Sequence, residues 1–591
     1  MPDKQHAYGQ FETPVDVADL LLGFCLRSPD DRLLDPSCGN GAILTRAALM
    51  QQWLDPGGAS EAKLWGVELD PIVAAYAQEA VPEAHIIESN FFEMRPESDG
   101  LFDAIVGNPP YTRAEWIGLT NVDLGVQRQI ARQLSMFGEG DETIPSPEGR
   151  GADGQNLSKR AGLHAYFFIH GAQFLREGGR FGFVVPNSWL DVAYGERLKQ
   201  YLLEHFKIIA LIESSVERWF SQARVNTCLV ILEKCGDADL RAINEVKMVR
   251  VRRPLRNLIP FKESDRRRLP FLESFIRPIM SEVNYEGEDK VVRGVMQQGL
   301  APADKWGYLL RAPTVLLKRT QDFELHPFKS WVSVKRGYTT GANSFFYLNQ
   351  ETIDEWEIEK AYRRPLLKSF RHINRRIVTP EDCSLQILSV GPDVRLKGTK
   401  VGEYILWGES QGIHQRRTCR GRQPWYCLPT QEEPALLLAK GIWERHFAPV
   451  VEGSILVDQQ LYQIYLADGI TLKAAAALLN SAWFELQLEL QGRVNFGEGV
   501  LWLATYEIEN LLLPDPRYIP SIQADELVAA FEALLDRPAG SVYEEAMQSD
   551  WQALNAVVFD ILGLSPMEGV AVTEALLERL STRKTKASAS H

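Results

Sequence analysis

The sequence has no apolar run long enough to cross a bilayer, which takes about 20 residues, and its first residues lack the apolar core of a signal peptide. We therefore expect a cytoplasmic protein with no membrane partner. Its seven cysteines form no Cys-x-x-Cys pair and stand apart from any clustered histidines. This distribution predicts neither a disulfide framework nor a metal site.

An excess of positive charge is also missing, because the formal net charge is −14. Indiscriminate binding to polyanions depends on Lys and Arg neutralising phosphates, so this class is excluded. Any nucleic-acid contact must use local basic clusters. Three lie beyond residue 240: Lys247, Arg250, Arg252, Arg253 and Arg256, then Arg363, Arg364, Lys368, Arg371, Arg375 and Arg376, then Arg416, Arg417, Arg420 and Arg422. A charge run most often marks a solvated face, but three clusters together favour a groove.

The sequence does contain an apolar strand, residues 102–106, that runs into the tetrapeptide Asn108-Pro109-Pro110-Tyr111. The prolines can continue neither a strand nor a helix, so the chain must turn there. The turn can hold the Asn108 side chain and the Pro109 carbonyl as acceptors beside the face of Tyr111. This set suits a planar group with an exocyclic amino group, such as a nucleobase. It equally suits a proline turn that caps a strand, with Tyr111 in ordinary packing.

Three earlier strand ends also carry residues typical of ligand binding. Residues 32–44 predict a strand, a glycine turn and a helix, and such a turn lets a ligand approach the backbone closely. The next strand ends in Glu68, which can accept hydrogen bonds from ribose, and the third is followed by Asn90 and Phe91. Open α/β sheets bind ligands at this edge.

Three motifs in this order resemble the class I, S-adenosylmethionine-dependent N6-adenine DNA methyltransferases of the gamma order. They are Gly-x-Phe-Glu-Thr-Pro around Phe11, Asp-Pro-Ser-Cys-Gly-Asn-Gly from Asp35, and Asn-Pro-Pro-Tyr from Asn108. The resemblance covers about residues 8–235. It implies an enzyme that methylates N6 of an adenine flipped out of double-stranded DNA, as the modification part of a restriction or phage-defence system. Cognate restriction or defence subunits are then expected partners.

The resemblance also implies the roles of individual residues. Glu68 is expected to hold the ribose, and Asn90 stands where the family often has aspartate, with Phe91 stacking on the cofactor adenine. The cofactor set is Phe11, Thr13, Asp35, Pro36, Cys38, Gly39, Gly41, Glu68, Leu69, Asn90, Phe91 and Asn108. The catalytic set is Asn108, Pro109, Pro110, Tyr111 and Phe220, in which Phe220 contacts the flipped base and Trp219 is its competitor.

The expected fold is α/β, with a Rossmann-like class I methyltransferase domain, a mixed α+β target-recognition domain and a helical C-terminus. The predicted boundaries are 1–240 for the catalytic domain, 241–310 for a connecting segment, 311–516 for the DNA-binding domain, and 517–591 for the helical region with a disordered tail from Ser581. Helices are predicted over 14–24, capped by Thr13, and over 165–175 and 472–490, strands over 181–185 and 225–232, and a loop over 138–156. Turns at 340–348 and 422–426 resemble those of the family's recognition domains.

Four alternatives stay open. A bifunctional restriction–modification enzyme would usually carry its nuclease before the first motif, where only a few residues lie, and Asp239, Glu245 and Lys247 look like a strand face. Methylation of RNA or of a protein glutamine would suit the same tetrapeptide, although the basic, aromatic C-terminal half favours DNA. A catalytically silent DNA-binding subunit is disfavoured by the intact motifs. N4-cytosine methylation is chemically close, although members of that group more often have serine before the two prolines.

Overall fold

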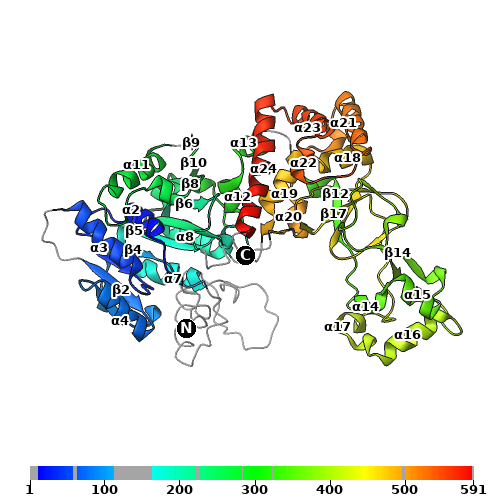
Figure 1. Cartoon of the computed structure of the whole chain (residues 1–591), viewed down its shortest axis with the longest axis horizontal. Helices are drawn as coiled ribbons and strands as arrows, with labels where there is room; N and C mark the ends of the chain where they lie inside the picture. The colour runs from blue at the N-terminus through cyan, green and yellow to red at the C-terminus, as the bar shows by residue number, and fades with distance from the viewer. Residues whose placement is uncertain are drawn as a thin grey trace. The chain divides into compact units, whose positions relative to one another are not determined.

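The computed structural model describes residues 11–56, 63–111, 163–192, 195–220, 226–282, 284–322, 325–494 and 499–588. The predicted loop at 138–156 lies outside this part. The chain forms two compact units, Met1–Arg311 with Ser588–His591, and Ala312–Ala587 (Figure 1). Within the described part, no helix is both long and apolar enough for a bilayer crossing.

Unit 1 is built on a ten-stranded sheet with the order β3-β2-β1-β4-β5-β7-β6-β8-β10-β9. The strands are β1 (Leu33–Asp35), β2 (Leu64–Glu68), β3 (His85–Glu88), β4 (Phe102–Gly107), β5 (Leu175–Pro186), β6 (Phe206–Ser214), β7 (Thr227–Lys234), β8 (Glu245–Val251), β9 (Asn284–Glu286) and β10 (Lys290–Met296). The first five strands pair in parallel, whereas β7 runs antiparallel between β5 and β6. This topology confirms the Rossmann-like fold class.

Both faces of the sheet are covered. Along β4, Ala104 and Val106 belong to one hydrophobic cluster and Ile105 to the other, as the two-residue period of a strand requires. Phe102 joins the cluster of Ile105, and the strand pairing shifts register between Phe102 and Ala104. The first cluster includes residues of α2, α3 and α11, and the second includes residues of α7, α8 and α12. Unit 1 contains the helices α2 (Val15–Cys25), α3 (Ala42–Leu54), α4 (Pro71–Ala80), α5 (Pro96–Asp99), α7 (Leu163–Gly171), α8 (Glu196–His205), α9 (Ala238–Ala242), α10 (Leu255–Leu258), α11 (Arg268–Ser281) and α12 (Trp306–Arg311).

The structure departs from the predicted elements of unit 1 in three places. The helix predicted over 165–175 ends at Gly171, and β5 already begins at Leu175. A bulge at Gly178, whose φ of +73° suits glycine, keeps the following residues in the strand. Thr13 does not cap α2, whose N-cap residue is Pro14.

The segment expected to connect two domains is part of the sheet instead. β8 pairs in parallel with β6, and β10 pairs antiparallel with β8, so residues 245–296 extend the catalytic sheet. The apolar residues of β8 are buried on both faces, since Val249 packs in one cluster and Met248 in the other. Unit 1 therefore extends well past residue 240.

Unit 2 has smaller mixed sheets, one with the order β12-β21-β17-β19-β15 and one with the order β13-β16-β14-β20. Its strands are β11 (His326–Pro327), β12 (Val332–Arg336), β13 (Tyr347–Leu348), β14 (Arg363–Leu367), β15 (Ile377–Val378), β16 (Leu385–Leu388), β17 (Leu436–Ala439), β18 (Gly441–Ile442), β19 (Val450–Val451), β20 (Leu456–Val457), β21 (Leu461–Leu466), β22 (Arg493–Val494), β23 (Leu501–Trp502) and β24 (Leu512–Leu513). Its helices are α13 (Thr314–Asp322), α14 (Asn343–Phe346), α15 (Gln350–Trp356), α16 (Lys400–Ser410), α17 (Arg417–Arg420), α18 (Leu472–Leu479), α19 (Ala482–Gln491), α20 (Thr505–Glu509), α21 (Ser521–Leu534), α22 (Val542–Glu545), α23 (Ser549–Ile561) and α24 (Pro566–Ser588). The mixed α+β region with a helical C-terminus is confirmed.

Two expectations for unit 2 are corrected. The single helix predicted over 472–490 is two helices, because the Asn480 side chain bonds the Ala448 backbone and Ser481 caps α19. The tail expected to be disordered from Ser581 is helical to Ser588. Buried Arg583 holds it through an ion pair with Glu489 at 2.6 Å.

Candidate functional site

Residues at the carboxyl ends of neighbouring parallel strands come together at one edge of the unit 1 sheet. β1 ends at Asp35, β2 at Glu68, and β4 leads into Asn108. Because β1 pairs with both β2 and β4, its end lies between the other two. The structure thus brings together three of the residues predicted from separate motifs.

The turn after β1 leaves its backbone open to a ligand. Gly39 and Gly41 have φ angles of +53° and +84°, which residues with a side chain rarely adopt. A Cβ atom built on Gly39 would meet no atom within 4 Å, so the space above this residue is empty. The Gly39 amide donates to Glu68 Oε2 at 3.1 Å, which ties the turn to the end of β2.

Two buried carboxyl groups face this turn, with Asp35 only 1% and Glu68 only 4% exposed. Asp35 Oδ1 accepts from the Ser37 amide at 3.1 Å, and Glu68 Oε1 accepts from the Leu69 and Asp70 amides. Burial, and to a lesser extent the nearby Glu68 carboxylate, raises the pKa of Asp35 to about 7. Neither carboxylate forms an ion pair within the described residues, so the pair suits a cationic ligand group.

Other predicted cofactor residues differ in exposure. Leu69 is 63% exposed at the tip of β2, while Pro36 and Cys38 are buried beneath the turn. Burial raises the pKa of the Cys38 thiol, with smaller contributions from Asp35 and Glu68. Cys38 is therefore a neutral packing residue rather than a nucleophile.

The two residues predicted to contact the cofactor adenine, Asn90 and Phe91, differ in their surroundings. The Phe91 ring is 3% exposed and packs against Phe167 and His170, with centroid separations of 5.4 and 4.8 Å. With Phe167 stacked on it and 3% of its surface exposed, Phe91 offers little surface to a stacking ligand. The amide oxygen of Asn90, predicted to accept from the cofactor, accepts from the Phe92 amide at 3.1 Å. An amide oxygen has two lone pairs, so its contact with the cofactor stays a prediction.

Asn108 is held in one orientation. Its Nδ2 donates to the Phe11 carbonyl at 2.8 Å, and a carbonyl can only accept, so the amide nitrogen must face Phe11. Its Oδ1 is buried and has no hydrogen-bond partner among the described residues. A buried acceptor without a partner costs free energy unless a ligand supplies the donor.

Three aromatic rings surround this amide. Phe11 lies 5.8 Å from Tyr111 and 6.4 Å from Phe220 between centroids, and Tyr111 meets Phe220 edge-on at 5.9 Å. The Tyr111 hydroxyl donates to the Val184 carbonyl at 3.3 Å, which fixes its ring. Trp219, the alternative to Phe220, makes no ring contact with Phe11 or Tyr111 among the described residues, although both Trp219 and Phe220 are buried and belong to the same core cluster. Pro109 is buried and Pro110 half-buried within the turn.

A second group of side chains supports the site and was not foreseen from the sequence. Asn187, at the end of β5, donates to Glu213 Oε1 at 2.8 Å. Arg311 binds Glu213 through two nitrogens at 2.9 and 2.6 Å and Asp191 at 2.6 Å. The sequence signal for this group was the position of Asn187 and Glu213 at strand ends, but Arg311, which joins Glu213 to Asp191, lies 98 residues after Glu213.

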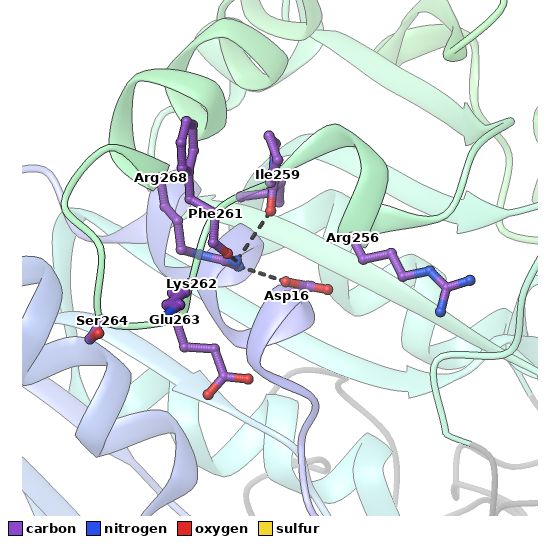
Figure 2. A pocket seen from close by; sticks show the side chains of 9 residues that line it. Asp16, Arg256, Ile259, Phe261, Lys262, Glu263, Ser264 and Arg268 are labelled. Carbon is purple, nitrogen blue, oxygen red and sulfur yellow. Dashed lines mark hydrogen bonds and ion pairs between the residues drawn. The ribbon is translucent and has the colours of Figure 1, made fainter.

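Helix α2, which follows Phe11 and Thr13, is anchored by buried arginines. Arg268 donates to Asp16 at 2.6 Å and to Asp19 at 3.0 Å, and Arg46 donates to Asp19 at 2.7 Å. Arg268 also holds the carbonyls of Ile259 and Phe261 (Figure 2). Asp19, a charged residue within an apolar helix, was the sequence signal for this network.

A cavity of about 650 Å³ lies beside this network. Figure 2 shows Asp16 and Arg268 facing each other within it, with Arg256 pointing away. None of the predicted site residues lines it; the lining residues are Asp16, Arg256, Ile259, Pro260, Phe261, Lys262, Glu263, Ser264 and Arg268. The cavity is therefore separate from the strand-end site.

Many cations of the first two basic clusters form ion pairs within the fold. In the first, Lys247 pairs with Glu245 at 2.5 Å and Arg252 with Glu286 at 3.1 Å. In the second, Arg376 is buried against Glu545. Further pairs in these clusters join Arg253 to Glu288, Arg364 to Glu433, and Arg375 to Asp382. Most of these cations therefore stabilise the fold.

The residues considered for a nuclease do not assemble into a site. Asp239 lies in α9, whereas Glu245 and Lys247 pair with each other on β8. Among the residues that the structure describes, no three His, Cys, Asp or Glu side chains are grouped to hold a metal ion.

Comparison with known proteins gives matches in both halves of the chain. Residues 60–220 match the Eco57I restriction-modification methylase family, and residues 304–549 match the C-terminal domain of the Type II methyltransferase M.Eco57I. The Type II methyltransferase M.AccI of Acinetobacter calcoaceticus is 22% identical over 72% of this chain and 69% of its own length. M.XamI of Xanthomonas campestris pv. amaranthicola is 21% identical over 71% of this chain and 69% of its length.

A solved structure shares the fold. It is the Type IIL restriction-modification enzyme MmeI, determined in complex with DNA. The match covers 96% of this chain and 75% of the MmeI chain, with a TM-score of 0.54 and 17% sequence identity.

Proposed function

We infer that this chain, a DNA methyltransferase of the restriction–modification type, transfers a methyl group from S-adenosylmethionine to N6 of an adenine flipped out of duplex DNA. The observation that carries the proposal is the oriented amide of Asn108. Its oxygen is buried without a partner, while its nitrogen is fixed on the Phe11 carbonyl. The site therefore presents an acceptor beside three aromatic rings.

The reaction follows from that acceptor. Asn108 Oδ1 and the Pro109 carbonyl accept the two N–H groups of the target amino nitrogen, which localises its lone pair away from the base ring. S-adenosylmethionine, when bound, would supply a methyl group on a sulfonium: as the N6 lone pair bonds to that carbon, the carbon–sulfur bond breaks and sulfur keeps its electron pair in the departing S-adenosylhomocysteine. The methylated N6 is then positively charged and loses one of its protons to solvent. Removal of one such preorganised group typically costs about 10²–10³ in rate.

The acidic pocket fits the proposed cofactor. S-adenosylmethionine carries a positive sulfonium and an ammonium group, and the two buried carboxyl groups have no cationic partner within the described residues. A cation beside Asp35 stabilises its ionised form, which burial otherwise disfavours. The open space above Gly39 leaves room for a ligand against the backbone.

The aromatic rings fit a flipped base. Extruding a base from the duplex costs a few kcal/mol, and stacking against aromatic side chains offsets that cost. The rings of Tyr111 and Phe220 stand nearly perpendicular, at 85°. Tyr111 is half-buried and can offer a ring face to the base, whereas Phe220 is only 4% exposed and packs edge-on against Tyr111, so its own contact with the base stays a prediction. Phe91, buried elsewhere, has no part in this proposal.

We place this activity in a restriction–modification system that acts in the cytoplasm with a cognate restriction or defence component. The similarity to the Eco57I restriction-modification methylase family and to Type II methyltransferases supports this placement. The unpaired basic residues of unit 2, described below, support a DNA substrate over a protein one.

The test is methyl transfer from labelled S-adenosylmethionine to mixed-sequence duplex DNA, with the modified nucleoside identified by mass spectrometry. We expect N6-methyladenine from the wild type and at least about 100-fold less from Asn108→Ala. The control is Asn257→Ala, an exposed asparagine of α10, which should leave transfer unchanged. N4-methylcytosine, or transfer only to RNA or protein, would overturn the adenine assignment.

A further inference from the structure

The third basic cluster differs from the other two, because three of its four arginines are unpaired. Arg416, Arg417 and Arg420 are exposed, and none lies within ion-pair distance of a carboxylate in the described residues. The fourth, Arg422, is half-buried and donates to the carbonyls of Thr339 and Thr340 at 2.9 and 2.7 Å.

Arg422 joins two loops into one surface. Beside it, the Cys419 thiol lies 3.6 Å from the Thr340 carbonyl. A Cβ atom on Gly341 would stand 2.4 Å from Thr418 Cβ, which shows how closely the two loops pack. In unit 2, α14 and α17 lie at the same end (Figure 1). We name this surface the Arg416 face, and its exposed residues are Thr339, Gly341, Asn343, Ser344, Gln415, Arg416, Arg417, Thr418, Arg420 and Gln423.

The Arg416 face rests on a rigid aromatic base. The Phe345 ring stacks on Tyr404 at 4.7 Å with an interplanar angle of 4°, and the Tyr404 hydroxyl donates to the Phe345 carbonyl at 2.8 Å. Trp425 lies 5.1 Å from Phe345 and donates to Glu409 at 3.0 Å. The backbone that carries the arginines is therefore fixed before any partner arrives.

We propose that the Arg416 face contacts the phosphates of duplex DNA through Arg416, Arg417 and Arg420. The inference rests on the proposed function and adds the residues that hold the substrate. A chain with a net charge of −14 repels a polyanion overall, so its DNA contact must lie where cations are exposed and uncompensated. Guanidinium groups suit phosphate because their donors match its oxygens in pairs.

Polar side chains on the same face suit a duplex better than an acidic protein. The exposed amides of Asn343 and Gln423 lie on the two joined loops, where they can reach base edges once the arginines hold the backbone. The Asn343 oxygen accepts from the Thr340 hydroxyl, so the outward-facing group is its amide nitrogen. That nitrogen offers donors to base acceptors in the major groove.

The salt dependence of DNA binding tests this inference. The full chain is titrated with a mixed-sequence duplex at several salt concentrations, comparing the wild type with the triple variant Arg416→Gln, Arg417→Gln, Arg420→Gln. Each phosphate contact adds about 0.9 to the slope of log K against log salt, so the triple variant should show a slope shallower by about 3. Its KM for DNA should rise while kcat at saturating DNA stays unchanged.

Two controls separate charge from structure. The triple variant Arg253→Gln, Arg267→Gln, Arg375→Gln removes the same charge from exposed arginines that already pair with Glu288, Asp265 and Asp382, and its slope should equal that of the wild type. Cofactor affinity, measured by calorimetry, should be the same in all three proteins and reports intact folding of unit 1. The melting temperature of unit 2 should also be unchanged, because the substituted side chains are exposed.

The outcomes distinguish the two proposals. If the wild type neither binds nor methylates duplex DNA, the proposed function is overturned. If it does both and the Arg416-face variant keeps the full slope, the function stands, the inference is overturned, and the face serves an acidic protein surface instead. A slope reduced only in the Arg416-face variant supports the inference.

Discussion

The two units carry unpaired charge of opposite sign. In unit 1, Asp35 and Glu68 are buried acids without a cation, and in unit 2, Arg416, Arg417 and Arg420 are exposed cations without an acid. Elsewhere, charged residues such as Arg268 and Arg376 are buried in pairs. In this protein, charge without a partner marks places that suit a ligand, whereas charge with a partner holds elements together.

Burial decides how each unpaired charge acts. Salt ions do not reach a buried carboxyl group, so its interaction with a bound ligand is screened little. Exposed guanidinium groups act over about 10 Å at 0.1 M salt and weaken as salt rises. Ligand binding at the buried acids should therefore depend little on salt, whereas binding at the exposed arginines should depend strongly on it.

The largest expected effect belongs to a paired charge. Arg268→Met leaves Asp16 without its arginine and weakens the buried anchor of α2. Loss of one partner from a buried pair costs about 3–5 kcal/mol, so we expect a clear fall in the denaturant midpoint. The control is Arg266→Met, an exposed neighbour, which should change the midpoint little. If Arg268→Met is as stable as the wild type, then ion pairing does not mark the charged residues that stabilise the fold.

The next effect belongs to the unpaired acid. Asp35→Asn removes a charge that has no cationic partner in the fold, so stability should be kept while cofactor affinity falls. Hydrogen bonds to charged groups contribute about 1.5–3 kcal/mol, which predicts a roughly 10- to 100-fold higher Kd by calorimetry. A variant that unfolds instead would show that Asp35 is structural.

The pKa of Asp35 gives a smaller, graded effect. Because this pKa is raised to about 7, the carboxyl group is protonated in the free protein below that value. A cationic ligand prefers the ionised form, so the Kd should rise by up to about tenfold per pH unit between pH 7 and 5. The stability of the free protein should fall as pH rises from about 4 to 7, because over this range Asp35 keeps its proton in the folded state and loses it in the unfolded state. Cofactor affinity, by contrast, should increase over the same range. Asp35→Asn should remove both dependences, and unchanged profiles in that variant would contradict the assignment.

The smallest effect sharpens the contrast between units. Cofactor affinity should be nearly the same at 50 mM and 500 mM salt, since the buried acids are shielded. DNA affinity over the same range should fall steeply, in proportion to the phosphates contacted. Calorimetry for the cofactor and a fluorescence titration for DNA, in matched buffers, measure both. A steep salt dependence of cofactor binding would break the comparison.

Local sequence was enough to foresee the strand-end site but not the packing around it. Asp35, Glu68 and Asn108 follow short apolar strands, and the parallel topology brings such ends together. Phe91 and Phe92 are adjacent aromatic residues, and the sequence does not say which one the rings of α7 cover. In the structure Phe167 and His170 contact both rings, but only Phe91 is buried, with Phe174 as a further neighbour.

The partners of charged residues were beyond prediction for a different reason. Arg268 pairs with Asp19 across 249 residues, and Arg376 pairs with Glu545 across 169. A cluster of arginines looks the same in the sequence whether or not carboxylates from distant positions form ion pairs with it. Only the fold shows that three cations in each of the first two clusters form ion pairs, whereas Arg416, Arg417 and Arg420 of the third form none among the described residues.

The extension of the sheet by β8 and β10 has a practical consequence for dissecting the gene. A fragment that stops at residue 240 would lose β8 and expose the edge of β6, whose apolar residues are then free to pair with other chains. Such a fragment should precipitate, whereas one that ends near residue 311 keeps the sheet complete. Exchange of recognition halves between enzymes of this type should therefore join the parts after Arg311 rather than after the last catalytic motif.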